Sequence, residues 1–218
     1  MATLNLNPYK PAPGNSVASV PIDNAFDAIM ASVNSIDATQ FAAGRIFDPT
    51  KLLEASSVQR IADSTLGADA ATMDFTSLSA NFAHLLIVAS LRGTGIVGVN
   101  VRMNNDSAAN YYLQSTQNSA GTITANSQNG ATQMEVGTLP NAAMMGVFAL
   151  FIPNYAAANF HKGVLILNGR ADTASQANMS SFVGVGLWNS VSAINRLTFL
   201  PDSGSIKQNS RISIYGLG

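Results

Sequence analysis

The stretch FAHLLIVASLRGTGIVGVNVRMNNDSAANYYLQS, residues 82–115, indicates the fold class. Its apolar run from Leu85 to Leu91 is typical of a mostly buried strand. A glycine-rich corner at 93–98 then turns the chain. From Val97 to Met103 apolar and polar residues alternate, which places them on opposite faces of a strand. After a polar loop Tyr111 begins another strand, so the stretch predicts antiparallel β structure.

Short apolar or alternating segments separated by turn residues recur throughout residues 58–218. No amphipathic helical stretch separates them, and their spacing is that of a β-sandwich rather than of βαβ units. We therefore expect a mainly β domain at 58–218, an antiparallel, jelly-roll-like β-sandwich of roughly nine to eleven strands. Besides the strands within 82–115, the predicted strands are 58–66, 71–76, 134–136, 146–152, 163–167, 182–188, 194–200 and 211–215.

Two Asn-Gly pairs predict where strands end. Asn168-Gly169 follows the apolar run 163–167 and is typical of a type I′ hairpin turn, which needs positive φ at both positions. Asn129-Gly130 lies in the polar segment 121–133, which predicts a long polar loop or the end of a hairpin.

The first 57 residues differ in composition from the β domain. Residues 1–20 are rich in proline and asparagine and predict an extended arm that becomes ordered on a partner. Pro21 suits the first position of a helix, and residues 21–36 are predicted to form a short one. Residues 37–57 form a connector, so we place the domain boundary at 57/58.

The predicted helix carries an apolar seam at spacings of 4, 3, 4 and 3 residues, formed by Ile22, Phe26, Ile29, Val33 and Ile36. This spacing is that of a coiled coil, and β-branched residues at both seam positions favour a coiled coil of three helices over one of two. An amphipathic helix docked on its own domain has the same spacing. A β domain after the helix favours self-association, so we expect the seam to join copies of the chain as a homotrimer.

Ile29→Asp tests this seam. A charge at the centre of the proposed coiled coil is expected to shift the protein toward monomer while the β domain stays folded, because an unpaired buried charge is strongly unfavourable. Light scattering measures the mass. A trimer that is unchanged by the substitution would contradict the seam without contradicting the fold.

Composition narrows the classes of function. The chain has 218 residues, 11 basic and 12 acidic side chains and a formal net charge of -1, which argues against a nucleic-acid or anionic-membrane surface. It contains no cysteine, which rules out disulfides, thiol catalysis and cysteine-ligated zinc. Its apolar runs are too short to span a bilayer, and its first residues lack an apolar core after a basic start, so we expect neither a membrane span nor a secretory signal.

Signatures of catalysis are weak. His84 and His161 are the two histidines, and a site built on them would need them to meet in space with a carboxylate. The aspartates Asp74, Asp106, Asp172 and Asp202 occur in turn contexts, where their side chains accept backbone hydrogen bonds. We expect no enzyme activity, cofactor or metal, with a carbohydrate-active enzyme as a remote alternative.

A sugar-binding platform is a further candidate. Tyrosine rings stack on sugars and amides bond their hydroxyls, which makes Asn104, Asn105, Asp106, Tyr111 and Tyr112 the candidate glycan-binding residues. Trp188 continues the alternation FVGVGLW and is expected in the core instead.

Several segments resemble virion proteins of tailed bacteriophages. FAHLLIVASLRG (82–93), VRMNNDSAANYYLQS (101–115) and the terminal SRISIYGLG (210–218) look like the C-terminal β domains of small tail fibres, head fibres and capsid decoration proteins. SIDATQFAAGRIFDPTKL (35–52) resembles the neck segments of phage fibres. These similar parts cover roughly residues 35–115 and 205–218, whereas 118–200 match by pattern alone.

The resemblance implies a structural protein of the virion, assembled in the cytoplasm of a bacterial host. It would be a short homotrimeric fibre whose N-terminal arm anchors to other virion proteins and whose outward β-sandwiches adhere to host surface glycans. The chain lacks the repetitive shaft of long fibres, which favours a compact fibre. The alternative is a capsid decoration or head-fibre protein that stabilises the shell, with the arm binding at a different place on the particle.

Overall fold

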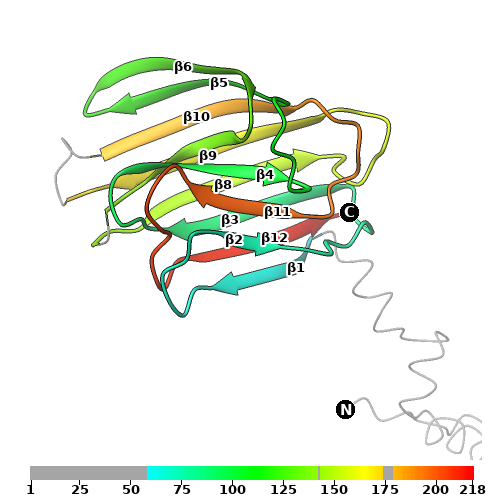
Figure 1. Ribbon diagram of the computed structural model, residues 1–218, viewed down its shortest axis with the longest axis horizontal. Coiled ribbons are helices and arrows are strands. Elements are labelled where there is room, and N and C mark those ends of the chain that lie inside the picture. The colour runs from blue at the N-terminus through cyan, green and yellow to red at the C-terminus, as the bar shows by residue number, and fades with distance from the viewer. Residues whose placement is uncertain (1–57, 142, 174–178) are drawn as a thin grey trace, which may run out of the picture. The chain divides into compact units, whose positions relative to one another are not determined.

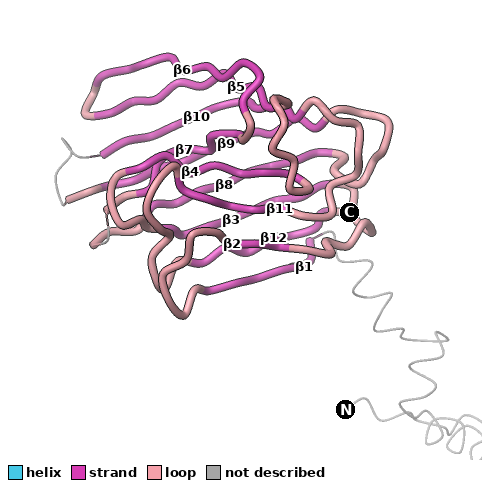
Figure 2. The backbone as a smooth tube through the Cα atoms, in the orientation of Figure 1, coloured by secondary structure: helices cyan, strands magenta, loops and turns pink. Residues whose placement is uncertain are grey.

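The computed structural model describes residues 58–141, 143–173 and 179–218 (Figure 1). The predicted arm, helix and connector of residues 1–57 lie outside the described residues, and so do Ile22, Phe26, Ile29, Val33 and Ile36 of the apolar seam. The described part of the chain consists of strands and loops without a helix (Figure 2), so it holds no helix that could cross a bilayer.

Twelve antiparallel strands in the described residues form two sheets, which confirms the expected β-sandwich (Figure 1). The large sheet has eight strands in the order β1-β12-β3-β8-β9-β10-β5-β6, and the small sheet has four in the order β2-β11-β4-β7. The strands are β1 (Val58–Thr65), β2 (Met73–Phe75), β3 (His84–Leu91), β4 (Val97–Met103), β5 (Tyr111–Ser119), β6 (Thr122–Ala131), β7 (Met134–Leu139), β8 (Gly146–Pro153), β9 (Lys162–Ala171), β10 (Met179–Trp188), β11 (Leu197–Pro201) and β12 (Arg211–Leu217).

The pairing order is that of a jelly roll with four extra strands on one side of the large sheet. In the small sheet β2 pairs with β11, β11 with β4 and β4 with β7. In the large sheet β3 pairs with β8, β10 with β5 and β5 with β6. The four strands β1-β12-β3-β8 facing β2-β11-β4-β7 account for the eight strands of a jelly roll. β9, β10, β5 and β6 extend the large sheet beyond β8.

The core lies between the two sheets and follows the alternation read from the sequence. Val99, Val101 and Met103 of β4 are buried, and so is Trp188 of β10, as expected. Asn100 lies on the opposite face of β4 and is nevertheless buried, because its side chain is bonded to a carboxylate described below. The glycine-rich corner at 93–98 connects β3 of the large sheet to β4 of the small one, also as expected.

Asn168-Gly169 is not a hairpin turn, contrary to the prediction. β9 continues through both residues to Ala171 and pairs with β8 on one side and β10 on the other. The Asn168 side chain is buried between the sheets, where Nδ2 donates to the Val147 carbonyl at 3.2 Å and Oδ1 accepts from the Thr138 N–H at 3.1 Å. The amide thus connects β8 of its own sheet with β7 of the small sheet, and neither partner is close in sequence.

Residues 121–133 are mostly strand rather than loop. The hairpin between β5 and β6 turns at Ala120 and Gly121, where φ is +53° and +87°, so the turn precedes the Asn129-Gly130 pair. Gly130 lies inside β6 with φ of +69°, next to the register shift opposite Tyr111 and Tyr112. The prediction missed β6 because its polar composition resembles that of a loop, and the number of strands therefore exceeds the expected range.

Candidate interaction surface

The outer face of the large sheet is apolar across its four central strands. Seven side chains on β3, β8, β9 and β10 point away from the core and are between 38% and 62% exposed. We call this set the apolar strip: Val88, Val147, Leu165, Leu167, Val183, Val185 and Leu187. A surface of this kind is a candidate interaction site, because the largest contiguous apolar patch on a soluble protein often has such a role.

The strand register makes the strip continuous. Across the sheet, Val88 is level with Ala149, which is level with Leu167 and then Val183. One step along the strands, Leu165 is level with Val185. Cross-strand neighbours on one face have Cβ atoms roughly 5 Å apart, so these residues form continuous rows on one surface.

The sequence basis of the strip is the set of unbroken apolar runs. Runs such as LLIVASL and GVFALFI are typical of strands buried on both faces. The fold buries one face of each: Leu85 and Ile87 are in the core, whereas Val88 is exposed. Within the described residues, only one of the two apolar faces of these strands is therefore covered by other residues.

Polar residues border the strip on both sides. On β1 and β12, Asp63 accepts hydrogen bonds from Arg211 at 2.9 and 3.0 Å and from Ser213 at 2.7 Å. The bond from Arg211, followed by that from Ser213, lowers the pKa of Asp63 to about 2. On β5, Gln114 and Thr116 point outward next to Val185 and Val183 of the strip, and neither carries a charge. An apolar centre with a polar rim is the usual anatomy of a protein interface.

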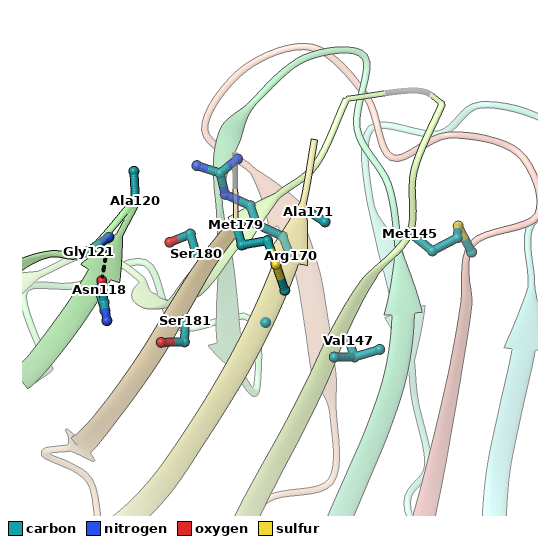
Figure 3. Close-up of a pocket in the computed structure, with 11 residues that line it drawn as sticks. Asn118, Ala120, Gly121, Met145, Val147, Arg170, Ala171, Met179, Ser180 and Ser181 are labelled. Atoms are coloured by element: carbon teal, nitrogen blue, oxygen red, sulfur yellow. Dashed lines mark hydrogen bonds between the residues drawn. The ribbon is translucent and has the colours of Figure 1, made fainter. Parts of the chain in front are cut away.

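A shallow hollow of about 520 Å³ lies at one end of the same face (Figure 3). Its lining comes from β8, β9, β10 and the β5–β6 hairpin, with Val147 and Met179 on the apolar side. Gly169 contributes no side chain there, which leaves the surface concave. Arg170 reaches the edge, but its guanidinium is bonded to Thr138 at 2.7 Å and paired with Asp172. The hollow is therefore a continuation of the apolar face and gives one end of it a concave shape.

Polar side chains of the predicted glycan-binding loop are largely engaged in hydrogen bonds within the protein. Asp106 accepts from the Trp188 indole at 2.7 Å, from the Asn110 amide at 2.9 Å and from the Ala108 N–H at 2.8 Å. Burial raises the pKa of Asp106, but the bonds from Asn110, Trp188 and Ala108 outweigh it, so the pKa lies below its ordinary value. This carboxylate anchors the loop to the lone tryptophan.

The structure separates the other members of the predicted glycan site. Tyr111 is fully buried, and burial raises its pKa to about 12, so its ring cannot stack on a ligand. Tyr112 points to the outer face of the large sheet beside Leu187. The Asn104 amide donates to the Ala193 carbonyl and accepts from two backbone N–H groups, whereas Asn105 is exposed.

The two histidines lie on loops or strand ends. His84 accepts a hydrogen bond from the Asn154 N–H at 3.1 Å and lies against Phe151, and His161 is exposed. Among residues 58–141, 143–173 and 179–218, no three His, Asp or Glu side chains gather closely enough to hold a metal ion.

A carboxylate pair that the sequence did not reveal lies on the outer face of the small sheet. Asp202 accepts from the Asn100 amide at 2.7 Å and from Gln133 at 3.5 Å. Burial, and then the charge of Asp202, raises the pKa of Glu135. The two residues are far apart in sequence, and neither occurs in a recognisable motif. The raised pKa of Glu135 has a direct consequence for stability.

Glu135→Gln is expected to stabilise the domain at neutral pH. Because the folded state raises the pKa of Glu135, that state binds its proton more tightly, and stability is lost as pH rises from the ordinary pKa of 4.5 through the raised value. Removing the charge abolishes this loss and should raise Tm by about 2 °C at pH 7. The same measurement at pH 4, below the ordinary pKa of Glu135, is the control. An equal gain at both pH values would contradict the electrostatic explanation.

Comparison with known proteins adds little to this description. No protein-family model matches the sequence, and no curated protein matches it. Among solved structures, an exo-inulinase from Aspergillus awamori is similar to it with a TM-score of 0.35 and 9% sequence identity. The match covers 73% of this chain and 29% of that enzyme.

Proposed function

We propose that this chain is a structural component of a bacteriophage virion and not an enzyme. It forms a short trimeric fibre whose residues 1–57 anchor it to other virion proteins and whose domain 58–218 is exposed. The observation that carries the proposal is the apolar strip of the large sheet, because such a face fits a protein that works as part of an assembly.

Two further observations support an assembly role. The segments 82–115 and 210–218 resemble virion proteins, and they form β3, β4 and β12 together with the start of β5. The surface also carries few charges, with 11 basic and 12 acidic side chains in the whole chain, so repeated copies do not repel one another. The predicted seam in 21–36 supplies a second contact between copies.

The proposal is tested on the full-length protein and on particles. Light scattering is expected to give the mass of three chains, and negative-stain electron microscopy to show three lobes at one end of a thin stem. Antibodies against residues 58–218 should label projections on intact particles of the phage that encodes the chain. A monomer at every concentration, or labelling of free protein alone, would overturn the proposal. Even labelling over the capsid surface would instead support the decoration protein.

A further inference from the structure

We infer that the apolar strip is the surface through which copies of this chain pack against one another, with the strips turned toward a shared axis. The inference rests on the proposed function for the number of copies, which is three. It goes beyond that function because it places a main contact between copies in the β domain. The sequence alone had predicted that contact in the seam of residues 21–36.

The area of the face fits a stable contact. The seven side chains of the strip, at 38% to 62% exposure, present on the order of 600 Å², the upper end of what monomers expose. The half-buried Ala149 and Phe151 and the polar rim would bring the face close to the roughly 800 Å² that each partner contributes to a standard interface.

The relief of the face suits another apolar surface. A second shallow depression of about 410 Å³ lies among Val88, Val147, Leu167 and Val183 and is floored by Ala149. This depression and the hollow at Gly169 lie over small residues, and the valine and leucine side chains around them project from the face. Such side chains interdigitate well because branched residues hold few rotamers and lose little entropy on burial.

The charges favour a copy of the same chain as the partner. A single ionic network, in which Arg211 and Arg60 flank Asp63, borders one side of the strip, and Gln114 and Thr116 border the other. The formal net charge of the whole chain is -1. Identical faces can therefore meet without repulsion between like charges. A strongly acidic or basic partner would find no complementary charge on this face.

Val185→Asp in the full-length protein tests the contact. Val185 is among the most exposed members of the strip and points away from its own core, so the substitution leaves the fold intact but would bury a carboxylate between copies. We expect loss of the trimer at concentrations where the wild type is fully assembled. Val147→Asp, on β8, should have the same effect. Ile96→Asp is the matched control, because Ile96 is similarly exposed on the loop before β4, outside the strip.

A gentler measurement uses the absence of cysteine from the chain. Val185→Cys and Ile96→Cys each introduce one thiol, and a maleimide reports how accessible it is in the native protein. We expect Cys at 185 to be protected at least tenfold relative to Cys at 96, with protection lost on dilution to monomer. Equal labelling at both positions would overturn the inference.

The outcomes separate this inference from the proposed function. A trimer that survives both strip substitutions but is lost in Ile29→Asp would overturn the strip contact and leave the trimeric fibre standing. A wild-type dimer lost in Val185→Asp would support the strip and overturn the trimer. A wild-type monomer with a protected thiol at 185 would overturn both, since residues of the same chain, such as 21–36, would then cover the strip.

Discussion

Trp188→Ala is expected to lower the free energy of unfolding by about 4 kcal/mol, the usual cost of truncating a fully buried large aromatic residue. Trp188 is 2% exposed at the end of β10, so the truncation leaves a cavity in the core. It also removes the indole N–H that Asp106 accepts at 2.7 Å, and this bond holds the loop between β4 and β5. Urea unfolding followed by circular dichroism gives the value.

Trp188→Phe separates the two contributions. It keeps most of the apolar volume but loses the N–H, so the loss should be about 1 to 2 kcal/mol. Equal losses for the alanine and phenylalanine variants would show that the hydrogen bond dominates, and a loss below about 1 kcal/mol for alanine would contradict the buried position.

Gly137→Ala should cost about 3 kcal/mol, since strained backbone and broken hydrogen bonds add together. Gly137 has φ of +127°, which an L-residue rarely adopts, and lies at the register shift between β4 and β7. A Cβ there would lie 2.4 Å from Oδ1 and 2.6 Å from Cβ of Asn168. The Asn168 side chain would have to leave its bonds to Thr138 and Val147, which connect β7 of the small sheet with β8 of the large one.

Gly95→Ala is the control for this substitution. No heavy atom lies within 4 Å of a Cβ at Gly95, and its φ is not in the left-handed region. We expect a change of less than about 0.5 kcal/mol, as for surface substitutions in general. Both variants are compared by thermal unfolding under the same conditions. A similar small effect at both glycines would contradict the proposed role of the Asn168 bonds.

Much of the fold could be predicted from the sequence because the evidence for it is local. Alternation placed Val99, Val101 and Met103 in the core, and the glycine-rich corner marked the passage from β3 to β4. Trp188 followed the same rule on β10. These features depend on periods of two residues and on backbone preferences within a few positions, which a single sequence displays directly.

The candidate surface was only partly foreseeable. The apolar runs indicated strands covered on both faces, but not that one face of four neighbouring strands would remain exposed together. The predicted glycan site was dispersed, because Tyr111 and Tyr112 point to opposite faces of β5. No local pattern connects Glu135 with Asp202, so that pair was found in the structure alone.

The sequence by itself therefore determined most of the strand-forming segments, the inward face of alternating strands such as β4, and the class of fold. The tertiary structure decided that Asn168-Gly169 continues a strand, because Asn168 finds partners on β7 and β8 about twenty to thirty residues away. It also decided that Val147, Leu167 and Val185 share one exposed face, because strand order and register bring them together. Backbone preference is a local property, whereas hydrogen-bond partners and neighbours on a sheet are set by pairings distant in sequence.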